Sequence, residues 1–130
     1  MSDSLNVDSR YRLSNRKTRA KFKKQRSVKG FCDGDVWDMY SYLLTLIPAM
    51  LDHLAENTHG YPTEIIENGV VRKMDEKTWP AFLHDLSNRF KHIEDRVNAD
   101  IASDQEYKQL LLDAKEAFSL LAENFYTLWD

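Results

Sequence analysis

The chain has 130 residues, of which 42% are hydrophobic, so it is long enough to form one domain around a single core. Its single cysteine, Cys32, excludes an internal disulfide and a zinc site built from cysteines. No apolar run reaches the roughly 18 residues that a membrane-spanning helix needs. We therefore expect a cytoplasmic protein that does not associate with membranes.

Basic residues are concentrated at the beginning of the chain. Residues 1–30 carry ten Lys and Arg against two Asp, a net charge of +8. Residues 31–130 carry eight Lys and Arg against 19 Asp and Glu, a net charge of −11. The sequence therefore predicts a basic N-terminal arm (1–30) and an acidic helical domain (31–130). Such an asymmetry bears on partners and self-association, not on the fold.

The basic arm lacks the apolar periodicity of a helix that faces a core, although a helix from Arg16 to Gln25 is expected once a partner neutralises its charge. Its cations suit contacts with nucleic-acid phosphates, whose affinity falls steeply with salt. The alternative is that the arm folds back onto the acidic domain of its own chain or of a neighbour. The residues expected to make these partner or phosphate contacts are Arg16, Lys17, Arg19, Lys21, Lys23, Lys24 and Arg26.

The first of three segments with the 3.6-residue periodicity of amphipathic helices spans residues 35–57. Asp35 precedes its apolar positions and is expected to cap the helix start. Pro48 lies inside the pattern and removes one backbone hydrogen bond, so we expect a kink there.

A short β-hairpin or loop insertion is expected between this helix and the next. The dipeptide Asn68-Gly69 lies between β-branched residues and is typical of a type I′ turn. Because an isolated two-stranded ribbon is only marginally stable in water, it must pack on the helices or on another subunit.

The other two periodic segments span residues 78–98 and 104–129. Thr78 is preferred over Asp75 as the cap of the former, because Pro80 then falls in the first turn. Ser103 followed by Glu106 predicts a capping box for the latter.

Together these segments predict an all-α fold, a three-helix bundle with a kinked first helix, the hairpin or loop insertion and the basic arm. We expect its dry interior to be shared by Trp37, Leu54, Phe90 and Phe125.

Motifs for catalysis are missing from the sequence. It contains no GxSxG elbow, phosphate-binding loop, GxGxxG or HExxH pattern, and the acidic group around Asp35 does not match a calcium loop. We therefore expect a protein that is not an enzyme and that uses no cofactor and no metal.

Several short motifs together resemble a family of small proteins of tailed phages. They are the run from Gly30 to Tyr40 with the pattern G-F-x-D-x-D-x-W, His59-Gly60-Tyr61-Pro62, the early Trp79 of the second helix and the aromatic segment from Phe118 to Trp129. The chain departs from the family pattern at Pro80 and at Asp130, where a second Trp is common. The family is functionally uncharacterised, so the resemblance implies a phage origin, a location in the host cytoplasm and a helical fold, but no catalytic residue.

Three functional hypotheses follow. The first is a homo-oligomeric binding protein that acts in host takeover or against host defence, in one version by sequestering a nucleotide-derived immune signal or binding a defence protein. In that version aromatic rings stack on the base, a histidine bonds the ribose and cations neutralise the phosphates. The second is a nucleic-acid-associated protein and the third a virion-assembly protein, both using the basic arm. The expected ligand-binding residues are Trp37, Tyr40, His59, Tyr61, Arg72 and Lys73.

Overall fold

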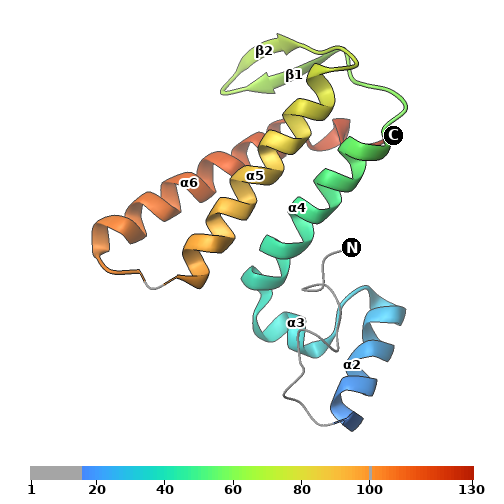
Figure 1. The fold of residues 1–130 in the computed structure, drawn as a ribbon, viewed down its shortest axis with the longest axis vertical. Helices are drawn as coiled ribbons and strands as arrows, with labels where there is room; N and C mark the ends of the chain where they lie inside the picture. The colour runs from blue at the N-terminus through green and yellow to red at the C-terminus, as the bar shows by residue number, and fades with distance from the viewer. Residues whose placement is uncertain (1–15, 100) are drawn as a thin grey trace. The chain divides into compact units, whose positions relative to one another are not determined.

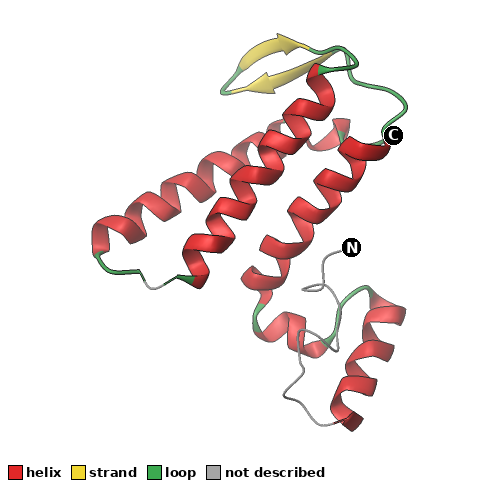
Figure 2. Ribbon diagram, in the orientation of Figure 1, coloured by secondary structure: helices red, strands yellow, loops and turns green. Residues whose placement is uncertain are grey.

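The computed structural model describes residues 16–99 and 101–130, and the protein is mostly helical with one small antiparallel sheet (Figures 1 and 2). The chain divides into two compact units, Met1–Leu46 and Ile47–Asp130. The charge distribution of the sequence predicts a boundary after residue 30 instead. Within the described ranges, no helix is both long enough and apolar enough to cross a membrane.

The first unit contains α2 (Arg16–Lys29), α3 (Asp33–Trp37) and the beginning of α4 (Met39–Asn57). Gly30 ends α2 because it adopts a φ of +84°, a left-handed conformation that favours glycine, and its N–H donates to the Arg26 carbonyl at 2.9 Å. Phe22 of α2 and Cys32 form a small buried core. The helix that the sequence predicts only with a neutralising partner is thus formed and packed in the isolated chain.

The helix predicted over residues 35–57 is divided into two. Asp38 separates α3 from α4 and has a non-helical backbone with φ −134° and ψ 55°. The hydrophobic periodicity continues across this break, so the pattern alone could not reveal it. Pro48 lies inside α4, as predicted.

The second unit contains the end of α4, strands β1 (Glu64–Glu67) and β2 (Val70–Lys73), α5 (Thr78–Asn98), α6 (Asp104–Glu123) and the 3₁₀ turn η2 (Phe125–Thr127). The strands pair antiparallel with Glu67 opposite Val70, and Asn68 and Gly69 have φ values of 53° and 78°. These values fit the predicted type I′ turn. The hairpin lies at the end of the α5–α6 pair (Figure 1), where Ile65 is fully buried.

Two of the four residues expected to share the interior are exposed. Phe90 is completely buried and contacts Phe118 edge to face at 5.0 Å, and Leu54 is half-buried. Phe125 is 60% exposed because α6 ends at Glu123, six residues before the predicted end, so Phe125 no longer follows its buried face. Trp37 is 74% exposed because the break at Asp38 separates it from the buried face of α4.

Polar contacts join the end of α4 to α5. The Ser87 hydroxyl donates to the Pro48 carbonyl at 3.1 Å. Asp52 accepts from Lys91 Nζ at 2.6 Å, and its other oxygen lies 3.0 Å from His84 Nδ1. Partial burial raises the pKa of Asp52, but the hydrogen bonds from Lys91 and His84 outweigh this effect and hold the pKa below its ordinary value. The carboxylate is therefore charged at neutral pH, and its contacts with Lys91 and His84 connect α4 to α5.

The helix caps confirm one prediction and correct another. The Ser103 hydroxyl accepts from the Glu106 N–H at 3.2 Å, as expected for the cap of α6, whereas the Glu106 carboxylate accepts from the Ala102 N–H at 2.9 Å and not from that of Ser103 as in the predicted capping box. At α5 the cap is made by Asp75, not by Thr78, because the Asp75 carboxylate accepts from the N–H groups of Lys77 and Thr78, both at 2.8 Å. Thr78 is the first helical residue.

Asn124 holds the hairpin against α6. Its buried side-chain amide accepts from the Ile66 N–H and donates to the Ile66 carbonyl, both at 2.8 Å, and also donates to the Leu120 carbonyl at 2.9 Å. We expect Asn124→Ala to lower the free energy of unfolding by about 2–3 kcal/mol, because it leaves the backbone groups of Ile66 without these partners. Urea unfolding measures this change. Asn124→Asp keeps the acceptor but places a buried carboxylate against the carbonyl oxygens of Ile66 and Leu120, so it should cost at least as much as the alanine variant; a smaller cost would contradict the assignment.

Candidate functional site

The strongest concentration of charge in the described chain is α2. Eight of its 14 residues are Lys or Arg and none is acidic. Helical spacing places Arg16, Lys17, Lys23 and Lys24 on the side opposite the buried Phe22, with the small residues Ala20 and Ser27 between them. These six residues, which we term the cationic face, are exposed.

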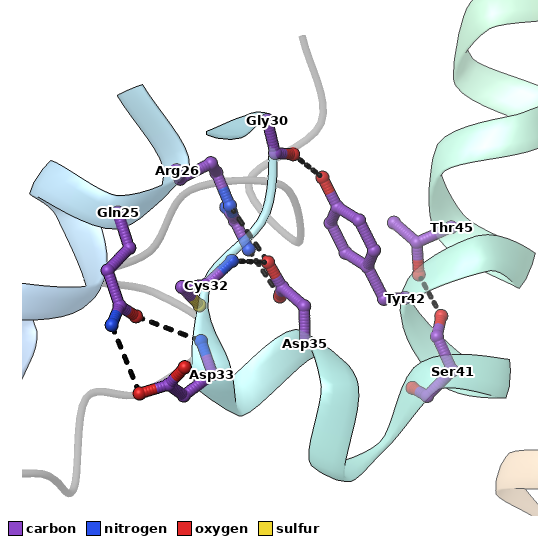
Figure 3. A network of polar contacts seen from close by, with 9 residues as sticks. All are labelled: Gln25, Arg26, Gly30, Cys32, Asp33, Asp35, Ser41, Tyr42 and Thr45. Atoms are coloured by element: carbon purple, nitrogen blue, oxygen red, sulfur yellow. Dashed lines mark hydrogen bonds and ion pairs between the residues drawn. The ribbon is translucent and has the colours of Figure 1, made fainter. Parts of the chain in front are cut away.

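The opposite side of α2 is fixed to the rest of the first unit by Arg26 and Asp35 (Figure 3). Arg26 Nε donates to Asp35 Oδ2 at 3.2 Å and its terminal nitrogen donates to Oδ1 at 2.5 Å. The side chains of Asp35 and Arg26 are only 1% and 15% exposed. Such a two-point pairing sets orientation as well as distance, so α2 cannot rotate without breaking it.

Further contacts surround this ion pair. The Asp35 carboxylate also accepts from the Cys32 N–H at 2.9 Å, and the Arg26 guanidinium lies over the Tyr42 ring at 5.0 Å. The Tyr42 hydroxyl donates to the Gly30 carbonyl at 3.2 Å. Burial raises the pKa of Asp35, but the hydrogen bonds from Arg26 and Cys32 outweigh it, so the pKa lies below its ordinary value. Asp35 is therefore ionised when it pairs with Arg26.

Gln25 makes a second attachment between α2 and α3. Its side-chain nitrogen donates to the Asp33 carboxylate at 3.0 Å, and its side-chain oxygen accepts from the Asp33 N–H at 2.9 Å (Figure 3). The two attachments leave the cationic face pointing away from the packed side of the helix.

The seven predicted phosphate-contact residues thus have different roles. Arg26 is half-buried and paired with Asp35, so it has a structural role, and this corrects its assignment as a phosphate contact. Lys21 lies 3.8 Å from Asp33 in an exposed ion pair, which contributes little in water. Arg19 is half-buried on the flank of the helix. The remaining four are the basic residues of the cationic face.

The six predicted ligand-binding residues are distributed over both units. Trp37 and Tyr40 belong to the first unit and are 74% and 60% exposed. The Trp37 ring contacts Phe22 of α2 edge to face at 5.5 Å. Its indole therefore lies beside the basic helix with most of its surface open to solvent, which suits stacking on a planar group.

The other four ligand-binding candidates belong to the second unit and are already engaged in part. His59 Nδ1 lies 2.8 Å from Asp130, and Tyr61 is 53% exposed. Arg72 lies 5.8 Å from the Phe82 ring centre and 3.6 Å from Glu67, and Lys73 lies 3.4 Å from Glu64.

Neighbouring strand residues project from opposite faces, so Arg72 and Lys73 do not converge on one ligand. A hollow of about 340 Å³ at the turn between α5 and α6 is lined by none of the six predicted residues, but by Arg96, Ala99, Ile101, Glu106 and Leu110. Its one cationic residue, Arg96, is paired with Asp113. Among the residues with described side chains, no group of three or more His, Cys, Asp or Glu is arranged to hold a metal ion.

The residues that position α2 were not predicted in that role from the sequence. The sequence predicts Asp35 as the cap that precedes the helix, but the cap position is Cys32, and Asp35 accepts the Cys32 N–H from the third position inside α3. Its pairing with Arg26 depends on a turn at Gly30 that returns the chain toward α2. The glycine itself, a residue type that often ends helices, was the one local signal available in the sequence.

Comparison of the chain with protein-family models, with curated proteins and with solved structures finds no match.

Proposed function

We propose that the chain is a nucleic-acid-associated protein that contacts the phosphates of a duplex through the cationic face of α2. The observation that carries this proposal is the helix with eight basic residues and no acidic one, fixed by its opposite side to the first unit. A phosphate backbone is the common biological partner for a dense array of Lys and Arg.

The dimensions of α2 suit a nucleic-acid groove. A helix of 14 residues is about 21 Å long, and the major groove of B-form DNA is wide enough to admit an α-helix. Ala20 and Ser27 lie in the middle of the cationic face, so the helix backbone can approach the phosphates while the longer basic side chains reach around them.

The ion pair of Arg26 with Asp35 supports this function indirectly. Because α2 is already folded and oriented, binding does not have to offset the entropy of ordering a flexible arm. The contacts are with phosphates and sugars, so we expect binding with little dependence on base sequence.

The salt dependence of binding to a 20-base-pair DNA duplex tests the proposal. Four phosphate contacts from the cationic face predict a slope of about −3.6 in a plot of log affinity against log salt concentration. Fluorescence anisotropy at several NaCl concentrations measures this slope. The absence of binding at low salt, or a slope near zero, would overturn the proposal.

A second candidate function is the capture of a nucleotide-type small molecule by a phage-encoded protein acting against host defence. The exposed rings of Trp37 and Tyr40 favour it, because planar bases stack on such rings. Isothermal titration with cyclic nucleotides and ADP-ribose derivatives tests this function, with Trp37→Ala as the variant that should lose binding. No heat of binding across this set would contradict it.

A further inference from the structure

The two edges of the β1–β2 hairpin differ in how their backbone groups are satisfied. In a two-residue hairpin closed by Glu67 and Val70, the backbone N–H and C=O of Ile66 point away from β2. Both groups are bonded to the side-chain amide of Asn124 at 2.8 Å, which occupies the position of a neighbouring strand. At Ile66 the outer edge of β1 is therefore closed by Asn124, the residue that follows α6.

The outer edge of β2 has no such cover in the described chain. By the same alternation, the N–H and C=O groups of Val71 and Lys73 point away from β1. The described residues form a sheet of two strands only, so no third strand lies beside β2. All four β2 residues are exposed, including Val70 at 66% and Val71 at 53%. An open edge with apolar side chains is a template for pairing with another strand.

We propose that β2 pairs antiparallel with β2 of a second copy of the chain, with the two-fold axis passing beside Val71. Hydrogen bonds between the two β2 strands form only where residues with outward-pointing backbone groups lie opposite one another. This condition is met when the two-fold axis passes beside Val71, Arg72 or Lys73. If the axis passes beside Arg72 or Lys73, that residue lies directly opposite the same residue of the second copy. Two like charges that face each other in this way destabilise the pairing. The Val71 centre avoids this, because Arg72 then faces the second copy's Val70.

The side chains of the Val71-centred register are also complementary. Ile66 faces Val71 within the hairpin, so the four-stranded sheet carries a continuous row of β-branched side chains across its outer face. The row runs Ile66, Val71, the second copy's Val71 and the second copy's Ile66. Ile66 is 39% exposed in the single chain, and cross-strand neighbours of this type stabilise sheets. The dimer carries one cationic face on each chain, and the pairing of the strands does not depend on the proposed function.

Disulfide trapping of the full chain tests the register. In Val71→Cys the two new cysteines face each other with Cα atoms about 5.5 Å apart, within the range of a disulfide. Lys73→Cys is the matched control, since it lies on the same face and strand but about 13 Å from its copy, too far for a disulfide. Mild oxidation should convert Val71→Cys, but not Lys73→Cys, into a covalent dimer on a non-reducing gel. Equal crosslinking of both variants, or none of either, would overturn the proposal.

The oligomeric state provides a second test that does not depend on oxidation. Light scattering at tens of micromolar should give a dimer for the native chain and monomers for Val71→Lys and Val71→Glu, in which like charges face each other. Mixing these two variants should restore a dimer, because opposite charges then meet across the axis. A monomeric native chain, or a Lys–Glu mixture that stays monomeric, would overturn the proposal whatever the outcome of nucleic-acid binding.

Discussion

Replacing Arg16, Lys17 and Lys24 together by glutamine should weaken duplex binding about a hundredfold at 0.1 M salt. Each lost phosphate contact removes about one counterion released on binding, so the slope of log affinity against log salt should become shallower by about 2.7. Glutamine retains good helix propensity, so α2 should persist. Fluorescence anisotropy with the 20-base-pair duplex measures both quantities, and circular dichroism checks the helix.

The matched control replaces three exposed lysines of the second unit, Lys77, Lys108 and Lys115, by glutamine. Both triple variants change the net charge by the same three units. A general electrostatic attraction would weaken binding equally in both, whereas a contact through α2 is weakened only by the first triple. Equal losses would therefore contradict the assignment of the cationic face.

Asp35→Ala should destabilise the first unit by about 3–5 kcal/mol, because it leaves the Arg26 guanidinium in a largely buried position without its carboxylate. Hydrogen–deuterium exchange of residues 16–45 measures the free energy of opening of this unit. The N–H of Cys32 also loses its acceptor, which adds to the effect.

Two variants establish whether this loss comes from the ion pair. Asp38→Ala removes an exposed carboxylate from the same segment and should change the opening free energy by less than 1 kcal/mol. The double variant Arg26→Met with Asp35→Leu removes both charges and should be more stable than Asp35→Ala, because no unpaired charge remains. A double variant less stable than the single one would contradict this account.

The pH dependence of the same unit has a defined direction. The pKa of Asp35 is lowered in the folded chain, so the unfolded state binds the proton more readily. The stabilisation is present above the ordinary Asp pKa of 3.8 and is lost as the pH falls through the folded value. Acid should therefore open the first unit of the native chain more strongly than that of the double variant, which lacks the carboxylate.

The elements with strong local signals could be predicted from the sequence. The helix over residues 78–98 has the predicted bounds, because the apolar period and Pro80 in the first turn agree. The Asn68-Gly69 turn was equally clear, because its positive φ values require residues of this type.

The parts that depend on tertiary contacts could not be predicted. α6 ends at Glu123, where the side-chain amide of Asn124 bonds to the backbone of Ile66 in β1. These residues are 58 positions apart, so no local sequence pattern predicts the contact. In the same way, hydrophobicity placed Trp37 in the interior, whereas the break at Asp38 left it exposed.

For the candidate site, the composition identified the basic segment. It did not show which basic residues face solvent and which one pairs with Asp35. Arg26 and Lys24 are equivalent in charge and both lie in α2. Only the folded chain distinguishes the one that faces Asp35 from the one that faces solvent. The turn at Gly30 makes this difference, because it decides which side of α2 is packed.

The burial of Cys32 gives the protein a built-in reporter. It is the chain's single cysteine and is 1% exposed, at the centre of the first unit. A thiol reagent can reach its sulfur only when that unit opens, so the labelling rate follows the local opening equilibrium. The second unit contains no thiol, so the labelling rate of the unmodified chain reports the opening of the first unit alone.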